Sequence, residues 1–384
     1  MTPRRLLILG AAATAALVAA LLLSNPHSSA QRQALDALYP GLEGQANAVT
    51  AVRIFKAGNA QAVEVRRKGA EWNVTERSGY PADVAKVRKL LLALAQARPI
   101  EQKTANPQNY ATLAVEDVGD AKAGGVRVEL EGTPKPVNLI VGKSGSGANS
   151  TYVRRVGESA SWLVDQNLAA SANPHDWLRT PILDIGADRV QSATITLGSA
   201  KPYSATKKTR ADADFAIDSL PQGKQLSAPS AANGFASALG ALTLADVRPA
   251  NDFTADPPLA HATYRTFDGL VAEVAGWMKD GKHYIAIKTS YDAALAQRFH
   301  VETRPPEKTV AAGKPAAEQT GAAADAVKPA AAVSTDAGKE ATAASEKAED
   351  AAKTTNAALA GWVYEIPEYR YEAIFKPLDS LLQQ

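Results

Sequence analysis

The sequence contains no cysteine. This absence excludes disulfide bonds, thiolate metal sites and cysteine nucleophiles, and it suits an oxidising compartment, where free thiols are a hazard. The chain also lacks a charge excess of either sign, with 42 basic and 40 acidic residues. Because nucleic-acid binders usually carry a basic excess, we expect no nucleic-acid partner. The 384 residues are enough for two domains of ordinary size.

Catalytic and cofactor motifs are missing as well. Gly142-Lys143-Ser144 resembles the end of a phosphate-binding loop, but the full motif needs a glycine where the chain has Val137. A hairpin loop is therefore the better interpretation. Ser144 and Ser146 do not have the spacing of a nucleophile elbow. The histidines lack the spacing of paired metal ligands, and we expect surface or strand roles for His27, His175, His261, His283 and His300.

Two other groups of side chains can be interpreted either as ligand-binding or as structural. Tryptophans can line a ligand groove, but those in strand-like runs more often fill a core; the five are Trp72, Trp162, Trp177, Trp277 and Trp362. The acidic pairs Glu116-Asp117 and Glu349-Asp350 are expected to be solvated loop residues, because glycosidic chemistry needs carboxylates that face each other across a cleft. We predict no catalytic, cofactor-binding or metal-binding residues, and a protein that is not an enzyme.

A membrane segment is expected near the N-terminus. Arg4 and Arg5 precede an apolar run over residues 6–23, whose one polar member is Thr14. As a helix this run spans roughly 27 Å, close to the hydrocarbon thickness of a bilayer. The position of the two arginines places the N-terminus in the cytoplasm. A cleaved signal peptide, with small residues at Ser28 and Ala30, is the alternative, but the run is longer than the usual signal-peptide core.

The first half of the chain has the periodicities of a sheet with one helix. Alternating apolar residues predict strands around Val52, Val63, Trp72, Val126, Val137, Tyr152 and Trp162. Between them, Val84, Val87, Leu91 and Leu94 form one apolar stripe at helical spacing. Asp83 stands where it can cap this helix, and a proline follows its end.

The same order of elements returns in the second half. Strands are predicted around Val190, Phe215, Tyr264, Leu270 and Tyr284, and a helical stretch opens at Pro229 and Ser230 with Phe235, Leu239 and Leu242 on its apolar side. The recurrence predicts an internal duplication, with chance repetition of a common strand–helix pattern as the alternative. Residues 305–360 interrupt this plan. They are rich in Ala, Lys, Glu and Thr without any aromatic residue, and we expect them to be disordered or transiently helical.

Several stretches of the chain resemble one bacterial family, the domain of unknown function 4340. They are Val49 to Ile54, Trp72-Asn73-Val74, Gly79-Tyr80-Pro81-Ala82-Asp83, Val137 to Gly142, Tyr152-Val153-Arg154, Trp162-Leu163-Val164 and Trp177-Leu178-Arg179. The resemblance implies an N-terminal membrane anchor and an accessory role beside ABC-type permeases of the gliding-motility or auxiliary transport kind. It offers no functional residues, and the low-complexity insert departs from the family's compact plan.

These observations predict an α+β fold of two related units, each a largely antiparallel sheet with one main helix, after a transmembrane helix. The expected parts are a cytoplasmic N-terminus (1–5), a membrane anchor (6–23), a juxtamembrane linker (24–48), a first unit (49–189), a second unit (190–304 and 361–384) and a disordered insert (305–360). We expect a single-pass protein of the bacterial inner membrane with its bulk in the periplasm. Its expected partners are the lipid bilayer and, as the family resemblance implies, ABC-type permease subunits, in an accessory or scaffold role. An extracytoplasmic hydrolase or glycan-binding protein is the alternative.

Overall fold

The computed structural model describes residues 36–383 except 148, 219, 254–255 and 301–333. The chain divides into two compact units, Met1–Leu178 and Arg179–Gln384, a division slightly earlier than the expected 189/190 boundary. The predicted cytoplasmic residues 1–5 and membrane span 6–23 lie outside the described residues. Among the residues that are described, no helix is both long enough and apolar enough to cross a membrane. The fold class is α+β, with two large antiparallel sheets and few helices.

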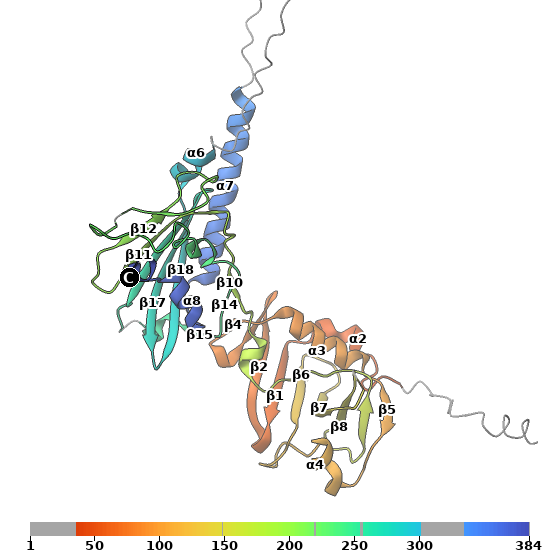
Figure 1. The fold of residues 1–384 in the computed structure, drawn as a ribbon. Coiled ribbons are helices and arrows are strands. Elements are labelled where there is room, and N and C mark those ends of the chain that lie inside the picture. The colour runs from red at the N-terminus through yellow and green to blue at the C-terminus, as the bar shows by residue number, and fades with distance from the viewer. Residues whose placement is uncertain (1–35, 148, 219, 254–255, 301–333, 384) are drawn as a thin grey trace, which may run out of the picture. The chain divides into compact units, whose positions relative to one another are not determined.

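The first unit is built on one nine-stranded antiparallel sheet with the order β4-β3-β2-β1-β6-β7-β8-β9-β5 (Figure 1). Its strands are β1 (Ala51–Lys56), β2 (Ala60–Lys68), β3 (Glu71–Val74), β4 (Tyr80–Pro81), β5 (Pro99–Gln102), β6 (Val126–Glu131), β7 (Val137–Ser144), β8 (Thr151–Arg155) and β9 (Ser161–Val164). The predicted strands of this half are therefore confirmed. Strand β5 was not predicted, because its residues are mostly exposed and show no clear alternation.

Alternation along the strands separates two faces of this sheet. Val52 and Ile54 of β1 are fully buried, whereas Arg53 between them is partly exposed on the other face. Helix α3 (Val84–Gln96) lies along the buried face (Figure 1) and buries Val87 and Leu94 completely. The helix begins where the sequence predicts, because the carboxylate of Asp83 accepts hydrogen bonds from the free N–H groups of Ala85 and Lys86.

Residues 36–48, part of the expected linker, are folded onto the first unit. Leu38 and Leu42 are buried, and the N–H of Leu38 donates to the carbonyl of Ala97 at the end of α3 at 2.6 Å. The hydroxyl of Tyr39 donates to the carbonyl of Asn138 on β7 at 3.0 Å. This segment contains the short helices α2 (Leu42–Gln45) and η1 (Ala46–Ala48). The prediction of a linker is wrong for these residues, because two leucines and a tyrosine of this segment pack against the first unit.

The second unit contains an eight-stranded antiparallel sheet with the order β13-β12-β11-β16-β17-β18-β19-β15. Its strands are β11 (Val190–Leu197), β12 (Tyr203–Thr206), β13 (Ala216–Ile217), β15 (Asp246–Pro249), β16 (Ala260–Thr266), β17 (Leu270–Lys279), β18 (Lys282–Tyr291) and β19 (Trp362–Ile366). Strands β10 (Pro181–Leu183) and β14 (Leu242–Thr243) form a separate pair. With β4 left aside, the two large sheets have the same strand order. In each sheet the last strand, β5 or β15, precedes in sequence the four strands that lie beside it, β6 to β9 or β16 to β19.

The helix expected from Pro229 to Leu242 is reduced to a single turn, α5 (Gly234–Ser237). Its apolar side is still buried, since Phe235, Leu239 and Leu242 are almost inaccessible to solvent. Two glycines, Gly234 and Gly240, lower the helix propensity of this short stretch. Helix α8 (Glu368–Ile374), next to β17, packs Tyr371 against the sheet instead, together with Phe375, the residue that follows the helix.

The insert is not disordered throughout. Helix α7 (Ser334–Leu359) runs beside β18 (Figure 1), where Ala352 and Leu359 are buried. Strand β19 pairs with β18 only from His283 to Ile285, so the later residues of β18 have a side that no strand occupies. There, the side chain of Asn356 accepts a hydrogen bond from the N–H of Thr289 at 3.0 Å. The prediction of disorder is wrong for residues 334–359, because this helix covers an otherwise unpaired sheet edge; residues 305–333 lie outside the described part.

Candidate functional site

The glycine-lysine-serine sequence has a packing role in the structure. Gly142 and Lys143 lie in strand β7, not before a helix. A Cβ at Gly142 would lie 2.3 Å from the carbonyl oxygen of Leu113, so only glycine allows the backbone at the end of α4 (Tyr110–Leu113) to approach this closely. The ammonium of Lys143 donates to the carbonyl of Thr112 at 3.0 Å. The preference for a hairpin over a phosphate loop is thereby confirmed.

The histidines are dispersed in the described part of the chain, where no group of three or more His, Asp or Glu side chains could hold a metal ion. His261 is exposed on β16, and the ring of His283 lies 4.9 Å from that of Tyr371. His175 lies 3.6 Å from the carboxylate of Asp176. His27 is outside the described residues, and His300 ends helix α6 (Ala293–His300).

Of the tryptophans, Trp72 and Trp177 are buried, whereas Trp162, Trp277 and Trp362 are half-buried. The acidic pairs have different surroundings. Asp117 accepts from the buried guanidinium of Arg154 at 2.7 Å, which anchors its loop to β8. Glu349-Asp350 lies on helix α7 instead of in a loop, and Glu349 pairs with Lys353 one turn later.

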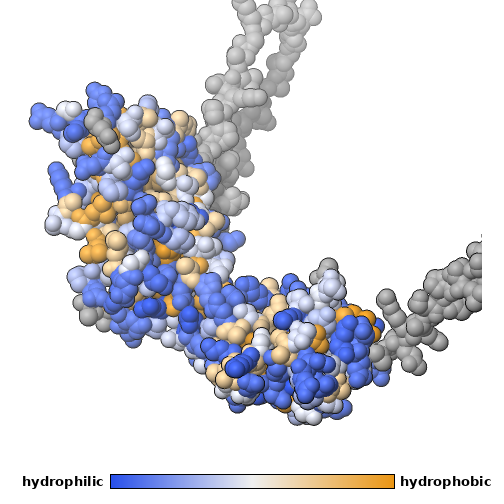
Figure 2. All heavy atoms as spheres, turned by 60° about the horizontal axis from the view of Figure 1, so that its bottom comes forward, coloured by the Kyte–Doolittle hydropathy of each residue, from blue (hydrophilic) through white to orange (hydrophobic). Residues whose placement is uncertain are grey.

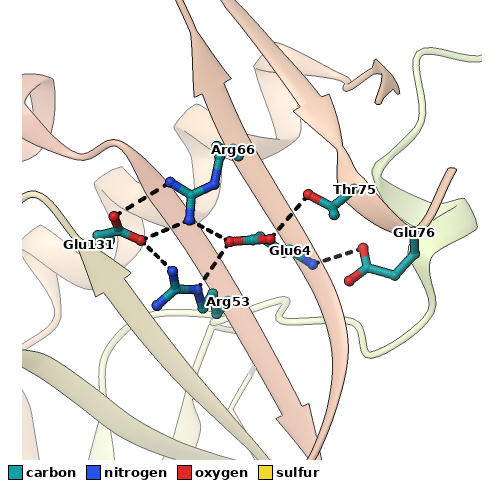
Figure 3. Close-up of polar contacts among 6 residues, drawn as sticks. All are labelled: Arg53, Glu64, Arg66, Thr75, Glu76 and Glu131. Atoms are coloured by element: carbon teal, nitrogen blue, oxygen red, sulfur yellow. Dashed lines mark hydrogen bonds and ion pairs between the residues drawn. The ribbon is translucent and has the colours of Figure 1, made fainter. Parts of the chain in front are cut away.

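A closed ring of two arginines and two glutamates lies on the face of the first sheet opposite α3 (Figure 3). Arg53 contacts Glu64 at 3.1 Å and Glu131 at 2.6 Å. Arg66 contacts the same two carboxylates at 2.7 and 3.0 Å. The four side chains come from three adjacent strands, β2, β1 and β6. Alternate charges joined in a ring hold both guanidinium groups in fixed orientations.

Glu64 is the least exposed member of this ring. Burial by itself would raise the pKa of its carboxyl group, but hydrogen bonds from Arg66 and Arg53 outweigh burial and leave that pKa below its usual value. Thr75 donates a further hydrogen bond to Glu64 at 3.2 Å. The backbone N–H of Glu64 donates to the side chain of Glu76 at 2.9 Å, just beyond the end of β3. Glu64 is therefore an anion held by donors from three elements.

The ring continues into an aromatic contact on the same face. Phe55 of β1 is in register with Arg127 of β6, and the guanidinium of Arg127 lies 4.2 Å from the centre of the Phe55 ring. Arg127 also contacts Glu129 at 3.0 Å. We call these residues together with the ring the charged strip: Arg53, Phe55, Glu64, Arg66, Arg127, Glu129 and Glu131. Arg53, Arg66 and Glu131 keep between 33 and 41% of their side-chain surface exposed.

A pocket of about 290 Å³ lies elsewhere in the first unit, between α3 and the segment that follows β9. It is lined by Lys86, Lys89, Leu90, Asn167, Ala169, Ser171, Asp176 and Trp177. The ammonium of Lys86 donates to the carbonyl of Asp176 at 2.8 Å. The indole N–H of Trp177 donates to the carbonyl of Ser171 at 2.9 Å. The pocket therefore combines an apolar wall with two lysines.

Residues 72–265 match the family described as a domain of unknown function (DUF4340). The chain belongs to this family. The match runs from β3 to β16 and so includes parts of both units, which confirms the suspected resemblance. All lining residues of the pocket lie inside the matched segment, whereas Arg53, Glu64 and Arg66 precede it. Neither the curated proteins nor the solved structures gave a match.

Both the charged strip and the pocket were absent from the sequence-based predictions. Alternation identifies Arg53, Glu64 and Arg66 as outward-facing residues of strands, but it does not say which strands are neighbours. The pocket joins α3 to residues that follow it by about 80 positions in sequence. The sequence contained one pattern that could have indicated each feature. For the strip it was the charged residues at alternate strand positions, and for the pocket it was the two lysines three residues apart on a helix.

Proposed function

We propose that this DUF4340 protein is a membrane-anchored extracytoplasmic accessory or scaffold protein that binds a protein partner at an envelope transport system of the ABC type. The observation that supports this role is the charged strip on the first sheet. It presents arginine, glutamate and phenylalanine side chains on a face that α3 does not cover. Arginine and aromatic residues are enriched in protein interfaces.

The strip has the properties of a pre-ordered interface. Arg53 and Arg66 are each held by two carboxylates, so a partner would not have to immobilise these long side chains on binding. Loss of side-chain freedom otherwise costs about 0.5–1.5 kcal/mol for each such residue. On the face of the molecule shown in Figure 2, hydrophilic residues predominate and hydrophobic residues are scattered. Six of the seven residues of the charged strip carry a charge, so a partner recognised by charge and shape fits the strip better than one recognised by a large apolar patch.

Strand addition at a sheet edge is a less suitable mode of binding. The edge strands of the two large sheets are short or carry a proline at one end: β4 ends at Pro81, β5 begins at Pro99, β13 has two residues and β15 ends at Pro249. Proline removes a backbone donor, and short edges offer little to pair with. We therefore assign partner binding to side chains on a sheet face.

The N-terminal anchor supports the role by proximity. Twelve residues, 24–35, separate the predicted span from the folded part, and a chain of this length reaches at most about 40 Å. The first unit would thus remain near the bilayer, at a high effective concentration toward membrane partners. A mature N-terminus at Gln31, found by mass spectrometry of membrane-extracted protein, would contradict the anchor and favour a cleaved signal peptide.

The shared strand order of the two sheets supports an origin of the two units by duplication. In the first unit, the hairpin that joins β8 to β9 is short, whereas in the second unit the corresponding connection between β18 and β19 contains the insert and α7. We infer that the second copy acquired the insert in this hairpin.

Photo-crosslinking in intact cells tests the partner role. A photoreactive phenylalanine analogue is placed at Phe55 in the charged strip, with a matched control at Tyr369, an aromatic residue 66% exposed on α8. We expect a permease subunit to crosslink from position 55 and not from the control or from an anchor-only protein. If neither position captures an envelope protein, and the purified protein instead hydrolyses or binds an envelope glycan, the alternative function replaces this one.

A further inference from the structure

We infer that the pocket beside α3 binds a small organic anion, a carboxylate with a short apolar body. This inference goes beyond the proposed scaffold role and does not depend on it. It rests on the composition of the walls, the charge at the rim and the way in which the two walls are joined. Each is a property of the first unit alone.

One wall of the pocket is apolar. Leu90 and Trp177 are buried side chains that contribute to the lining, together with the methyl group of Ala169. The indole N–H of Trp177 is already used by the carbonyl of Ser171. The indole therefore offers the pocket carbon surface and no free donor, which suits the hydrocarbon part of a ligand.

The rim of the pocket is positively charged. Lys86 and Lys89 lie one turn apart on α3, so their side chains project from the same face of the helix. Lys86 uses one of its three donors on the carbonyl of Asp176. Lys89 has no hydrogen-bond or ion-pair partner among the residues that the structure describes. Two ammonium groups thus have donors available beside an apolar wall.

The carboxylate of Asp176 does not neutralise these lysines directly, because it is bonded within its own loop. One of its oxygens accepts from the hydroxyl of Ser171 at 2.6 Å, and the other lies 3.5 Å from the amide nitrogen of Asn173. His175 contacts the second oxygen at 3.6 Å. The lining residues therefore carry two positive charges and one negative charge, and the negative carboxylate is bonded to residues of its own loop. The local field in the pocket favours an anion.

The two walls are joined by backbone contacts that form the pocket before any ligand binds. The N–H of Asp83, the residue that caps α3, donates to the carbonyl of Trp177 at 2.8 Å. Ala82 and Leu178 form an isolated antiparallel bridge next to this bond. These contacts and the Lys86–Asp176 bond hold the first turn of α3 against the opposite wall. A site that is already formed loses little affinity to ordering.

The size and donor set define the class of ligand. A volume of about 290 Å³ is near the lower limit of small-molecule sites, so a ligand smaller than a typical drug fits. The lining contains no arginine, which would favour bidentate recognition of a phosphate. Lysine supplies a point charge, and the apolar wall then distinguishes an organic carboxylate from an inorganic anion.

Saturation-transfer NMR and calorimetry on the full chain in detergent micelles test this inference, with acetate, butyrate, hexanoate, hexanamide and inorganic phosphate as probes. We expect saturable binding that strengthens from acetate to hexanoate and weakens about tenfold or more for the uncharged hexanamide. Lys89→Gln should weaken hexanoate binding about tenfold, whereas Lys68→Gln, a change at an exposed lysine of β2, should leave it unchanged. The thermal unfolding midpoint of each variant shows that it is folded.

The inference would be overturned by no saturable binding of any carboxylate, by equal binding of hexanoate and hexanamide, or by equal affinity in the Lys89→Gln and Lys68→Gln variants. Phosphate binding as tight as hexanoate binding would reject the organic ligand class. Crosslinking from Phe55 in the Lys89→Gln variant separates the two proposals. It should persist if the charged strip binds a partner independently of the pocket.

Discussion

Arg66 on β2 and Glu131 on β6 form an ion pair of 3.0 Å across the intervening strand β1. Both residues are in register with Ala51 of β1, whose side chain is fully buried beneath them. A methyl group is small enough for the two long side chains to meet above it. The closed ring of charges therefore depends on Ala51, a small apolar residue that is not itself part of the ring.

Ala51→Leu should break the Arg66–Glu131 contact and destabilise the protein. Overpacking of a buried position costs about 1–3 kcal/mol, and urea unfolding of the variant measures this loss. Ala60→Leu at an exposed position of β2 is the matched control, with a change within about 0.5 kcal/mol. Equal effects of the two substitutions would show that Ala51 does not limit the space beneath the ring.

Glu64 should make stability depend on pH. Its pKa in the folded protein is lowered, since hydrogen bonds from Arg66 and Arg53 outweigh the effect of burial. The stabilisation by a carboxylate with a lowered pKa is present above its unfolded-state pKa, about 4.3, and is lost as the pH falls through the lower folded-state pKa. Glu64→Gln should therefore reduce the free energy of unfolding by about 1–3 kcal/mol at pH 7, and the difference from the wild type should shrink below about pH 4.

Urea unfolding between pH 3 and pH 7 measures this dependence. Glu71→Gln, at an exposed position of β3, is the matched control and should differ little from the wild type at any pH. A difference between wild type and Glu64→Gln that stays constant over this range would mean that the ring does not stabilise the ionised carboxylate.

Neighbouring leucines of α3 should respond in opposite ways to truncation. Leu91 is 7% exposed and packs toward the sheet, whereas Leu92 is 51% exposed. Leu91→Ala should cost about 2–5 kcal/mol, as for other core leucines. Leu92→Ala should change the free energy of unfolding by no more than about 0.5 kcal/mol. Chemical denaturation of both variants checks the prediction, and similar losses would mean that the buried face of α3 is misassigned.

Helix α7 should contribute stability through the edge of β18. Asn356→Ala removes the acceptor of the Thr289 N–H, and a buried backbone donor without a partner costs about 1–3 kcal/mol. Thr354→Ala, at an exposed position of the same helix, is the control, with little effect. Thermal and urea unfolding measure both changes.

Segment replacement extends this test to the whole insert. A Gly/Ser linker in place of residues 305–333 should leave stability unchanged, if the low-complexity part is dispensable. The same replacement of residues 334–360 should cost more than about 1–2 kcal/mol, because packed contacts are lost. Tolerance of both replacements would contradict the role assigned to α7.

Gly142→Ala should destabilise the first unit even when the solution contains no phosphate. The added Cβ would lie 2.3 Å from the carbonyl of Leu113, a backbone atom that cannot rotate away. We expect a loss of about 1–3 kcal/mol, as for other overpacked positions. Gly147→Ala, where the nearest atom lies 3.5 Å away, is the control and should be neutral or slightly stabilising. An effect of Gly142→Ala that appears only with added phosphate would revive a phosphate-binding role.

Local patterns in the sequence determined much of the secondary structure. Alternation located most strands of both sheets, and the spacing of Val87, Leu91 and Leu94 with Asp83 located α3 and its first residue. These features depend on neighbours within a few residues, so the sequence contains all the information that they need. The stretch around Gly234 and the helix α7 were mispredicted, since burial of Phe235 needs no long helix and the alanine-rich α7 is stabilised by contact with β18.

The sequence by itself also determined the absence of cysteine chemistry and the family to which the chain belongs. Only the tertiary structure decided which charges meet and where a pocket forms. Arg66 and Glu131 are 65 residues apart, and Lys86 and Asp176 are 90 apart. Strand order and the packing of α3 bring these pairs together, and both follow from the burial of the whole apolar surface, to which residues throughout the unit contribute.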